Sequence, residues 1–325
     1  LPGFRFETVA DFRAAYRDGD ATPSEVADKV LAAIRANDER QPPMRTMIAV
    51  DDDDVRAMAE ASTARWKAGE PRSVFDGVPV AVKDELEQVP YPTTVGTRFL
   101  GTTPATGDAT VVARLREAGA VLIGKAAMHE IGIGVTGLNL HHGTPRNPYD
   151  PGHHTGGSSS GPAAAVAAGL CPVAIGADGG GSIREPAGLC GVSGIKATYG
   201  RVSEHGAFPL CWSVGHVGPL AATVTDLALG YAICAGVDPH DPGTAIQPPA
   251  TLQGLDDGAL AGLKVGVFSP WFDDASDEVV AAARGAVGLL EAAGAEVVEV
   301  EVPDLDLCRI AHLITIASEM ATSME

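Results

Sequence analysis

The sequence predicts an α/β fold, and three observations support this prediction. Short β-branched runs alternate with segments of helical periodicity along the chain, which is the order of elements that α/β folds produce. Hydrophobic residues make up 45% of the 325 residues, enough to bury a large core. The chain shows no linker, low-complexity tract or periodic repeat, so we expect a single domain over residues 1–325.

The elements follow in order along the chain. Thr22-Pro-Ser-Glu25 is a capping box with proline at the first helical position, and it predicts a helix that continues to Ile34. Residues 78–82 form a β-branched run, which predicts a buried strand that ends at Lys83. Further helices are predicted near residues 109–118, 162–168, 276–293 and from 305 onward, and further strands near residues 121–123, 172–175, 263–268 and 295–302.

Charge and composition disfavour two classes of binding partner, nucleic acids and anionic membranes. The chain has 42 acidic and 23 basic residues, and its net charge of −19 would repel nucleic acid phosphates and anionic membrane surfaces. No apolar run approaches the roughly 18–20 residues that a membrane span needs, and no signal peptide is visible. The five cysteines form no C-x-x-C pair, which predicts neither a disulfide framework nor a zinc site and favours the cytoplasm.

Two loops rich in glycine and serine carry the strongest chemical signal. The first is Thr-Gly-Gly-Ser-Ser-Ser-Gly at residues 155–161, and the second is Asp-Gly-Gly-Gly-Ser-Ile-Arg at residues 178–184. Glycine lets backbone N–H groups approach a reacting atom because no Cβ stands in the way, so the second loop can build an oxyanion hole. The alternative is that both are flexible turns or anion-binding helix N-termini.

Lys83 has two interpretations. A lysine after a buried strand is usually a surface residue or half of an ion pair, and Asp84 or Glu85 can supply the partner. A lysine that acts as a base must be uncharged, which burial favours and nearby carboxylates oppose. In a continued strand Glu85 would share the face of Lys83, so we expect the chain to turn there.

Two other motifs are weaker. Residues 157–161 match the nucleophile-elbow pattern with Ser159 at its centre, but no strand-like run precedes them, so Ser159 is the second candidate nucleophile. Residues 132–137 match the dinucleotide fingerprint, but they follow the helix-like segment 126–131 where that motif requires a strand.

Two histidine pairs raise the question of a metal site. Adjacent histidines rarely converge on one ion, and loop histidines that hydrogen-bond the backbone are the favoured interpretation. We expect no metal and no organic cofactor. The two pairs are His141-His142 and His153-His154.

Taken together, these features resemble the amidase signature family. Lys83 and Ser158 are 75 residues apart, and Ser158 and Ser182 are 24 apart, which fits the family spacing. The resemblance extends from the Thr22 helix to the end of the chain. Within the family, residues 128–147, 168–171 and 311–317 look most like plant-type fatty acid amide hydrolases and their bacterial relatives. The matching segments are residues 77–84, 124–130, 143–148, 155–161 and 178–187.

The resemblance implies a role for each site residue. Ser182 is the nucleophile, Ser158 is the bridging serine that also lies against the substrate, and Lys83 is the base. It further implies a cis peptide bond between Gly157 and Ser158, and a substrate-facing backbone at Gly132. The implied oxyanion hole consists of the backbone N–H groups of Gly179, Gly180, Gly181 and Ser182.

The resemblance also implies the architecture, a mixed and mostly parallel central sheet flanked by helices on both faces. It leaves a homodimer open. One departure is Glu185, where many relatives carry an apolar residue. A second is length: the family is longer, so we expect its final strands and part of the substrate pocket to lie beyond Glu325.

The predicted function is an amidase that hydrolyses a small-molecule carboxylic amide through a serine acyl-enzyme, with N-acyl or fatty acid amides as candidate substrates. One alternative keeps the same three residues in the A subunit of a glutamine-dependent aspartyl/glutamyl-tRNA amidotransferase. Another is a non-catalytic fragment or scaffold of the same fold.

Overall fold

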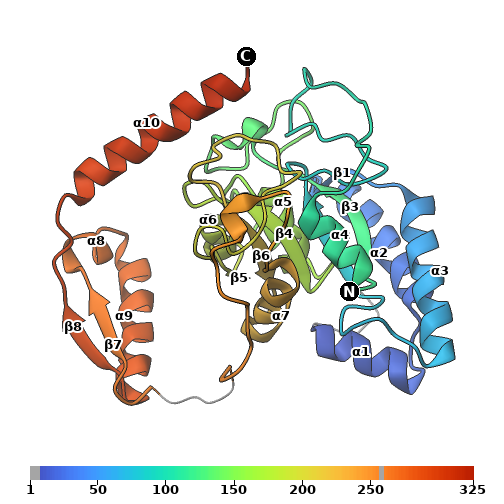
Figure 1. Cartoon of the computed structure of the whole chain (residues 1–325), viewed down its shortest axis with the longest axis horizontal. Coiled ribbons are helices and arrows are strands. Elements are labelled where there is room, and N and C mark those ends of the chain that lie inside the picture. The colour runs from blue at the N-terminus through green and yellow to red at the C-terminus, as the bar shows by residue number, and fades with distance from the viewer. Residues whose placement is uncertain (1–7, 256–259) are drawn as a thin grey trace. The chain divides into compact units, whose positions relative to one another are not determined.

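The structure, a computed structural model, divides into two compact units (Figure 1). Unit 1 contains the described residues up to Thr251 together with Ser318–Glu325, and unit 2 contains the described part of Leu252–Ala317. The described residues are 8–255 and 260–325. Residues 256–259, where the sequence predicts no linker, lie outside the described residues. A single domain over residues 1–325 stays a prediction.

A six-stranded sheet organises unit 1, in the order β1-β3-β2-β4-β6-β5 (Figure 1). Strand β2 pairs in parallel with both β3 and β4, whereas β1, β6 and β5 each pair antiparallel with a neighbour. Strands β2, β3, β4 and β5 therefore point in one direction, so the sheet is mixed and mostly parallel, as predicted. The strands are β1 (Met47–Ala49), β2 (Pro79–Lys83), β3 (Val121–Ala126), β4 (Val173–Ala177), β5 (Ser193–Gly194) and β6 (Val217–Ala221).

The helices of unit 1 begin and end at signals in the sequence. Helix α2 begins after Thr22, whose side chain and backbone exchange hydrogen bonds with Glu25, so the predicted capping box is confirmed. Thr8 and Asp11 build the same box at α1, which our sequence prediction missed. The helices are α1 (Val9–Asp18), α2 (Pro23–Asp38), α3 (Asp52–Ala68), α4 (Thr110–Glu117), α5 (Ser160–Ala167), α6 (Arg184–Leu189) and α7 (Val224–Cys234).

Helices α5 and α7 cover opposite faces of β4. A Cβ placed on Gly176 would lie 2.7 Å from the hydroxyl of Ser159, the residue that precedes α5. A Cβ placed on Gly230 of α7 would lie 3.2 Å from a methyl group of Val173. Gly176 and Val173 face opposite ways because side chains alternate along a strand. Strands β2, β3, β4 and β6 are accordingly buried along their whole lengths.

The helix-like interpretation of residues 126–131 is wrong. Strand β3 extends to Ala126, and the chain then forms only a single 3-10 turn, η1 (Glu130–Gly132). The backbone of Ala127 is held by two other segments, because its N–H donates to Thr46 O at 2.9 Å and its carbonyl accepts from Gly161 N at 2.7 Å. These bonds occupy groups that a helix would use internally.

Unit 2 contains a two-stranded parallel sheet of β7 (Lys264–Val267) and β8 (Glu296–Glu299) with short helix α8 (Ser269–Phe272) and helix α9 (Asp277–Ala292). Helix α10 (Leu305–Ser323) belongs to unit 2 as far as Ala317. Strands β7 and β8 and helices α9 and α10 match the four elements predicted there, whereas α8 was not predicted. Strand β8 ends earlier than predicted because the register of the pair ends at Val267 and Glu299.

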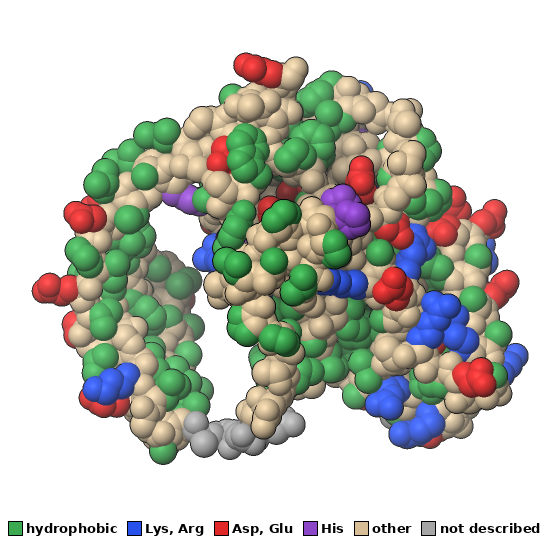
Figure 2. Space-filling view, viewed as in Figure 1, with side chains coloured by type: hydrophobic (Ala, Val, Ile, Leu, Met, Phe, Trp, Pro, Cys, Tyr) green, Lys and Arg blue, Asp and Glu red, His purple; other side chains and the backbone are tan. Residues whose placement is uncertain are grey.

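Charged side chains of both signs gather over α2 and α3 on the face that Figure 2 shows. Arg56 there pairs with Asp28 at 2.9 Å and also contacts Asp52, which pairs in turn with Arg35. Within the described part of the chain, no helix has the length and apolar character that crossing a membrane requires.

Candidate active site

Lys83 is the last residue of β2, and the neighbouring strands bury it to 1% exposure. Its Nζ donates a hydrogen bond to Ser158 Oγ at 2.8 Å and another to Ala177 O, at the end of β4, at 3.2 Å. The lysine that the resemblance implies as a base thus contacts the serine that it implies as a bridge.

The chain turns directly after Lys83, as expected, and Leu86 N donates to Lys83 O at 3.1 Å. The turn nevertheless leaves Glu85 beside the lysine, with Oε2 2.6 Å from Lys83 Nζ. Lys83 therefore forms an ion pair and contacts Ser158 at the same time, so its two interpretations do not exclude each other.

Asp84 fixes this turn. Its carboxylate accepts hydrogen bonds from Gly96 N at 3.0 Å and from the hydroxyl of Thr94, and it lies 3.6 Å from Lys125 Nζ. Lys125 is fully buried on β3, and this burial lowers the pKa of its ammonium to about 8, although Asp84 opposes the shift. Lys125 was not predicted as a site residue, although it lies in the matching segment 124–130.

The Ser158 loop contacts the turn that contains Gly132. His129 N donates to Ser158 O at 3.1 Å, and the peptide bond between Gly157 and Ser158 is cis, as the resemblance implies. Gly132 has a φ of +69°, and a Cβ placed on it would lie 3.6 Å from Ser158 Oγ and 2.8 Å from Leu210. The predicted substrate-facing glycine therefore lies next to the predicted bridging serine.

Ser159, the second candidate nucleophile, forms hydrogen bonds with the backbone of strand β4. It is fully buried, its hydroxyl donates to Ala177 O at 3.1 Å, and it accepts from Ala177 N at 3.2 Å. The described residues immediately before it form no strand. This environment disfavours the nucleophile-elbow interpretation.

Ser182 lies beside the first loop, because Ser159 N donates to Ser182 O at 3.1 Å. Ser182 is buried to 9% exposure, and its hydroxyl makes no hydrogen bond with any residue that the structure describes. An amine, a hydroxyl bonded to it and a second, uncommitted hydroxyl can together support nucleophilic attack with proton transfer.

Asp178 organises the loop that carries Ser182. Its carboxylate accepts hydrogen bonds from Gly181 N at 2.7 Å and Ile183 N at 3.0 Å, and from the guanidinium of Arg184 at 3.0 Å. Burial alone would raise the pKa of Asp178, but the bonds from Arg184 and the two amides outweigh it, so this pKa lies below its usual value.

The four predicted oxyanion donors differ in their surroundings. The Gly181 amide is engaged by Asp178, whereas the amides of Gly180 and Ser182 make no hydrogen bond within the described chain. A Cβ placed on Gly179 would lie 2.5 Å from Cys211 Sγ, so a larger residue here would require the Cys211 side chain or the loop to shift. Glu185, at a position where many relatives carry an apolar residue, lies close to Gly181. Burial raises the pKa of its carboxyl group, and the charge of Asp178 adds to the shift.

A segment that sequence analysis missed, residues 204–211, borders the site. Phe208 N donates to Glu85 O at 2.9 Å, and Leu210 and Cys211 lie against Gly132 and Gly179, respectively. The segment carries no motif, and it reaches the site through pairing with residues more than a hundred positions earlier. Sequence patterns report local structure, so no signal indicated it.

The histidine pairs make local contacts. His142 Nε2 lies 2.9 Å from Thr97 O, and His154 Nδ1 accepts from Gly156 N at 3.1 Å. His141 contacts Glu130 at 2.9 Å, and His153 contacts Asp150 at 3.0 Å. Hydrogen bonds to the backbone thus occupy one member of each pair. Within the described residues, no group of three or more potential ligands could hold a metal ion.

Comparisons with known proteins identify the family. The profile described as Amidase matches residues 28–325. A fatty acid amide hydrolase from Medicago truncatula is 43% identical over 330 residues, covering 99% of this chain and 54% of that protein. The A subunit of the glutamyl-tRNA(Gln) amidotransferase from Halorhodospira halophila is 39% identical over 319 residues, covering 98% and 65%. The chain belongs to the amidase signature family, as the sequence predicted.

Solved structures support the same fold. The native peptide amidase from Stenotrophomonas maltophilia matches with a TM-score of 0.90 at 32% identity, over 98% of this chain and 67% of that one. The chain spans about half the length of the fatty acid amide hydrolases that it matches.

Proposed function

We propose that this protein is an amidase that converts a carboxylic amide into an acid and an amine or ammonia through a serine acyl-enzyme. The observation that carries the proposal is the 2.8 Å contact between Lys83 Nζ and Ser158 Oγ, next to the loop of Ser182. In this proposal Ser182 is the nucleophile, Ser158 the proton bridge and Lys83 the base.

The proposed reaction passes through an ester between the acyl group and Ser182. Ser182 Oγ attacks the amide carbon while its proton moves to Ser158, whose own proton moves to Lys83. The C–N bond then breaks as Lys83 returns a proton through Ser158 to the leaving nitrogen. Water attacks the resulting ester, gives one proton to the same relay, and releases the acid as Ser182 regains its hydrogen.

Backbone amides supply the proposed oxyanion hole. The Gly180 and Ser182 amides are the foremost candidates, because neither is engaged within the described chain, whereas Asp178 holds the Gly181 amide. An oxyanion donor contributes about 3–4 kcal/mol to the transition state in well-studied enzymes. Gly179 remains in the proposal as the residue whose lack of a Cβ brings the loop against Cys211.

The segment that follows Gly132 favours an apolar acyl group. The segment after Gly132 exposes Ile133, Val135, Leu138 and Leu140, with exposures from 53% to 88%. It passes close to Ser158, because a Cβ on Gly157 would lie 2.7 Å from Gly134 O. Such a surface can bury hydrocarbon. We therefore propose N-acyl or fatty acid amides as substrates, in line with the names of the plant relatives.

A fluorophosphonate probe tests the nucleophile. We expect mass spectrometry of the labelled peptide to place the adduct on Ser182, Ser182→Ala to abolish labelling, and Lys83→Ala to slow it by about 100-fold or more. Ser159→Ala is the matched control, because the elbow interpretation requires labelling there. An adduct on Ser159, or unchanged labelling of Ser182→Ala, would contradict the proposal.

A substrate screen separates the alternatives. We expect hydrolysis of long-chain amides in preference to short aliphatic amides. Release of ammonia from glutamine alone would favour the amidotransferase interpretation, and absence of both labelling and hydrolysis would favour a scaffold.

Localisation in the cytoplasm and assembly into a homodimer stay predictions. The five cysteines are all free in the structure, which agrees with a reducing compartment.

A further inference from the structure

Glu85 is the acidic group closest to the proposed base. Its Oε2 lies 2.6 Å from Lys83 Nζ, and both residues are buried, at 8% and 1% exposure. Glu85 Oε2 forms no well-aligned hydrogen bond with any residue that the structure describes. The contact with Lys83 is therefore chiefly electrostatic, and it is the interaction that compensates the buried carboxylate.

The backbone fixes Glu85 in this position from two sides. The turn that follows β2 is closed by the bond from Leu86 N to Lys83 O, and Phe208 N donates to Glu85 O at 2.9 Å. Leu86 also forms an isolated bridge with Ala207, so the Glu85 turn and the 204–211 segment lie side by side. The position of the carboxylate thus does not depend on its own side-chain hydrogen bonds.

Other titratable groups surround the pair. Burial, together with the charge of Glu85, raises the pKa of Glu204 to about 8, and Asp241 and Glu319 contribute to the same shift. Burial raises the pKa of the Cys211 thiol to about 12, with contributions from Glu85 and Glu204, while Lys83 opposes the rise. Among these groups Lys83 is the cation, and Glu85 is the acid in contact with it.

We propose that Glu85 is a positioning residue that holds the Lys83 side chain against Ser158 and sets the pH range in which the proposed base is active. The inference rests on the proposed function. A carboxylate this close to an ammonium stabilises the charged form, so Glu85 opposes release of the proton that a lysine base must lose. In return it orders a four-carbon side chain that would otherwise sample several rotamers.

The test is the pH profile of the rate at which a fluorophosphonate labels Ser182. In Glu85→Gln, which keeps the shape and removes the charge, we expect the midpoint of the acid limb to move to lower pH by about one to three pH units. At a pH below both midpoints, lowering the midpoint by one pH unit raises the labelling rate about tenfold. The high-pH plateau falls by only a few-fold.

Glu204→Gln is the matched control. It removes a neighbouring carboxyl group that makes no contact with Lys83, and below about pH 8 that group is mostly protonated. We expect the acid limb below pH 8 to stay in place. If Glu85→Gln does not fold, Glu85→Asp, which keeps the charge but retracts it by one methylene, should move the midpoint in the same direction by less.

The outcomes separate the two proposals. Labelling that survives in Ser182→Ala overturns the proposed function itself. If labelling requires Ser182 and Lys83 but the midpoint in Glu85→Gln, or in Glu85→Asp where that variant replaces it, equals that of the unsubstituted protein, only the role of Glu85 is overturned. A purely structural role would lower the plateau and leave the midpoint unchanged.

Discussion

Ser158 and Ser159 are adjacent, but their hydroxyls face different parts of the molecule. Ser158 Oγ meets Lys83 Nζ at 2.8 Å, whereas Ser159 Oγ exchanges two hydrogen bonds with the backbone of Ala177. The first contact joins two side chains that can exchange a proton, and the second completes the buried end of β4. Ser158 is therefore placed for proton exchange, whereas its neighbour Ser159 stabilises the sheet.

Paired substitutions test this division. We expect Ser158→Ala to lower the rate of amide hydrolysis by about 100-fold or more, because the relay loses its middle member, with little change in stability. We expect Ser159→Ala to cost about 1–3 kcal/mol of the free energy of unfolding, because a buried backbone N–H loses its partner, and to retain much of the activity. Urea titrations and hydrolysis rates measure both, and an exchange of the two phenotypes would contradict the assignment.

The candidate site could be predicted in part. Lys83, Ser158 and Ser182 stand in motifs whose residue types and spacing reflect chemistry, and the structure brings Lys83 to Ser158 and the two loops together. Glu85 was foreseen as a partner because it follows Lys83 so closely. Cys211 and Glu204 could not be foreseen, because their place near the site depends on long-range pairing of the chain.

At the scale of elements, close approach of α5 to the end of β3 positions the Ser158 loop. Gly161, the second residue of α5, allows this approach: a Cβ there would lie 2.3 Å from Ala127 N and 2.5 Å from Thr46 O. Both are backbone atoms, which cannot rotate away as a side chain can. The helix therefore depends on glycine at this position.

Gly161→Ala should accordingly cost about 2 kcal/mol or more of the free energy of unfolding, within the range of overpacked cores. Gly188→Ala is the matched control, since a Cβ on this glycine of α6 would meet nothing within 4 Å. There we expect no loss, or a gain of up to about 1 kcal/mol from helix propensity. Equal losses at the two positions in thermal unfolding would argue against close packing at α5.

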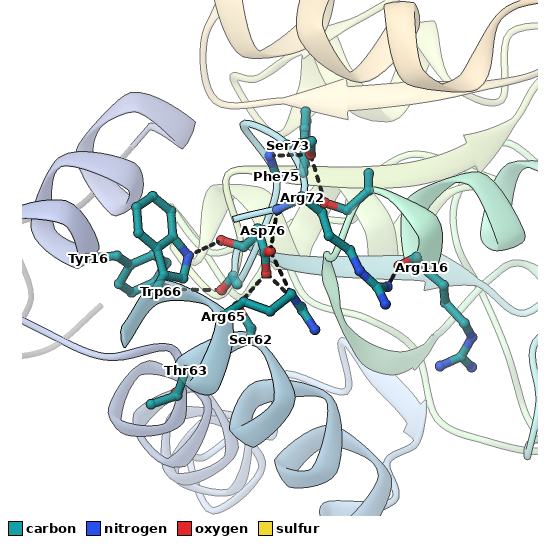
Figure 3. Close-up of polar contacts among 12 residues, drawn as sticks. Tyr16, Ser62, Thr63, Arg65, Trp66, Arg72, Ser73, Phe75, Asp76 and Arg116 are labelled. Atoms are coloured by element: carbon teal, nitrogen blue, oxygen red, sulfur yellow. Dashed lines mark hydrogen bonds and ion pairs between the residues drawn. The ribbon is translucent and has the colours of Figure 1, made fainter. Parts of the chain in front are cut away.

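A buried carboxylate connects α3 to β2. Asp76 is fully buried just before β2, and its side chain accepts hydrogen bonds from Ser62 and from Arg65, both on α3, and from Arg72 N, as Figure 3 shows. Trp66 of α3 donates to the Asp76 carbonyl at 3.0 Å. The start of the strand that ends at Lys83 is thereby fixed to a helix.

Asp76→Asn should destabilise the protein by about 3 kcal/mol at pH 7, because Arg65 loses its partner in a largely buried pair. Burial alone would raise the pKa of Asp76, but the bonds from Arg65, Ser62 and Arg72 lower it. A carboxyl group with a lowered pKa stabilises the fold above its unfolded value of about 3.9, and this contribution disappears as the pH falls through the folded value.

The difference in unfolding free energy between Asp76→Asn and the unsubstituted protein should therefore be full at pH 7 and shrink below about pH 4. Urea unfolding at several pH values measures it. Asp18→Asn is the control, since Asp18 pairs with Arg17 on an exposed surface and its loss should leave stability unchanged. A difference that stays constant with pH would show that the charge of Asp76 is not the cause.

At the scale of the whole molecule, the alternation of strands and helices was predictable, and the strand order was not. The period of apolar residues reports which segments are buried, and β2, β3 and β4 were predicted in this way. The elements that were missed include strands β1, β5 and β6 and helices α1, α3, α7 and α8. The antiparallel pairing of β6 with β4 depends on the whole sheet. A pattern read over neighbouring residues does not report such long-range pairing.

The two units differ in how deeply their strands are buried, and this predicts unequal local stability. Strands β2 and β4 pair in parallel inside a covered sheet, whereas in the two strands of unit 2 only Val267 is buried. Hydrophobic side chains line the visible surface of unit 2 in Figure 2, and the exposed ones of this unit include Leu289, Leu307 and Leu313. A two-stranded sheet is marginally stable unless other elements cover it.

Hydrogen exchange followed by mass spectrometry tests this inequality. We expect the amides of β7 and β8 to exchange through local opening well before those of β2 and β4, whose opening requires global unfolding. Both pairs are parallel, so hydrogen-bond geometry is matched and the comparison reports burial. Equal protection of the two pairs would mean that unit 2 is stabilised as strongly as the buried sheet, and the exposed apolar residues of α9 and α10 would then have to be covered in solution.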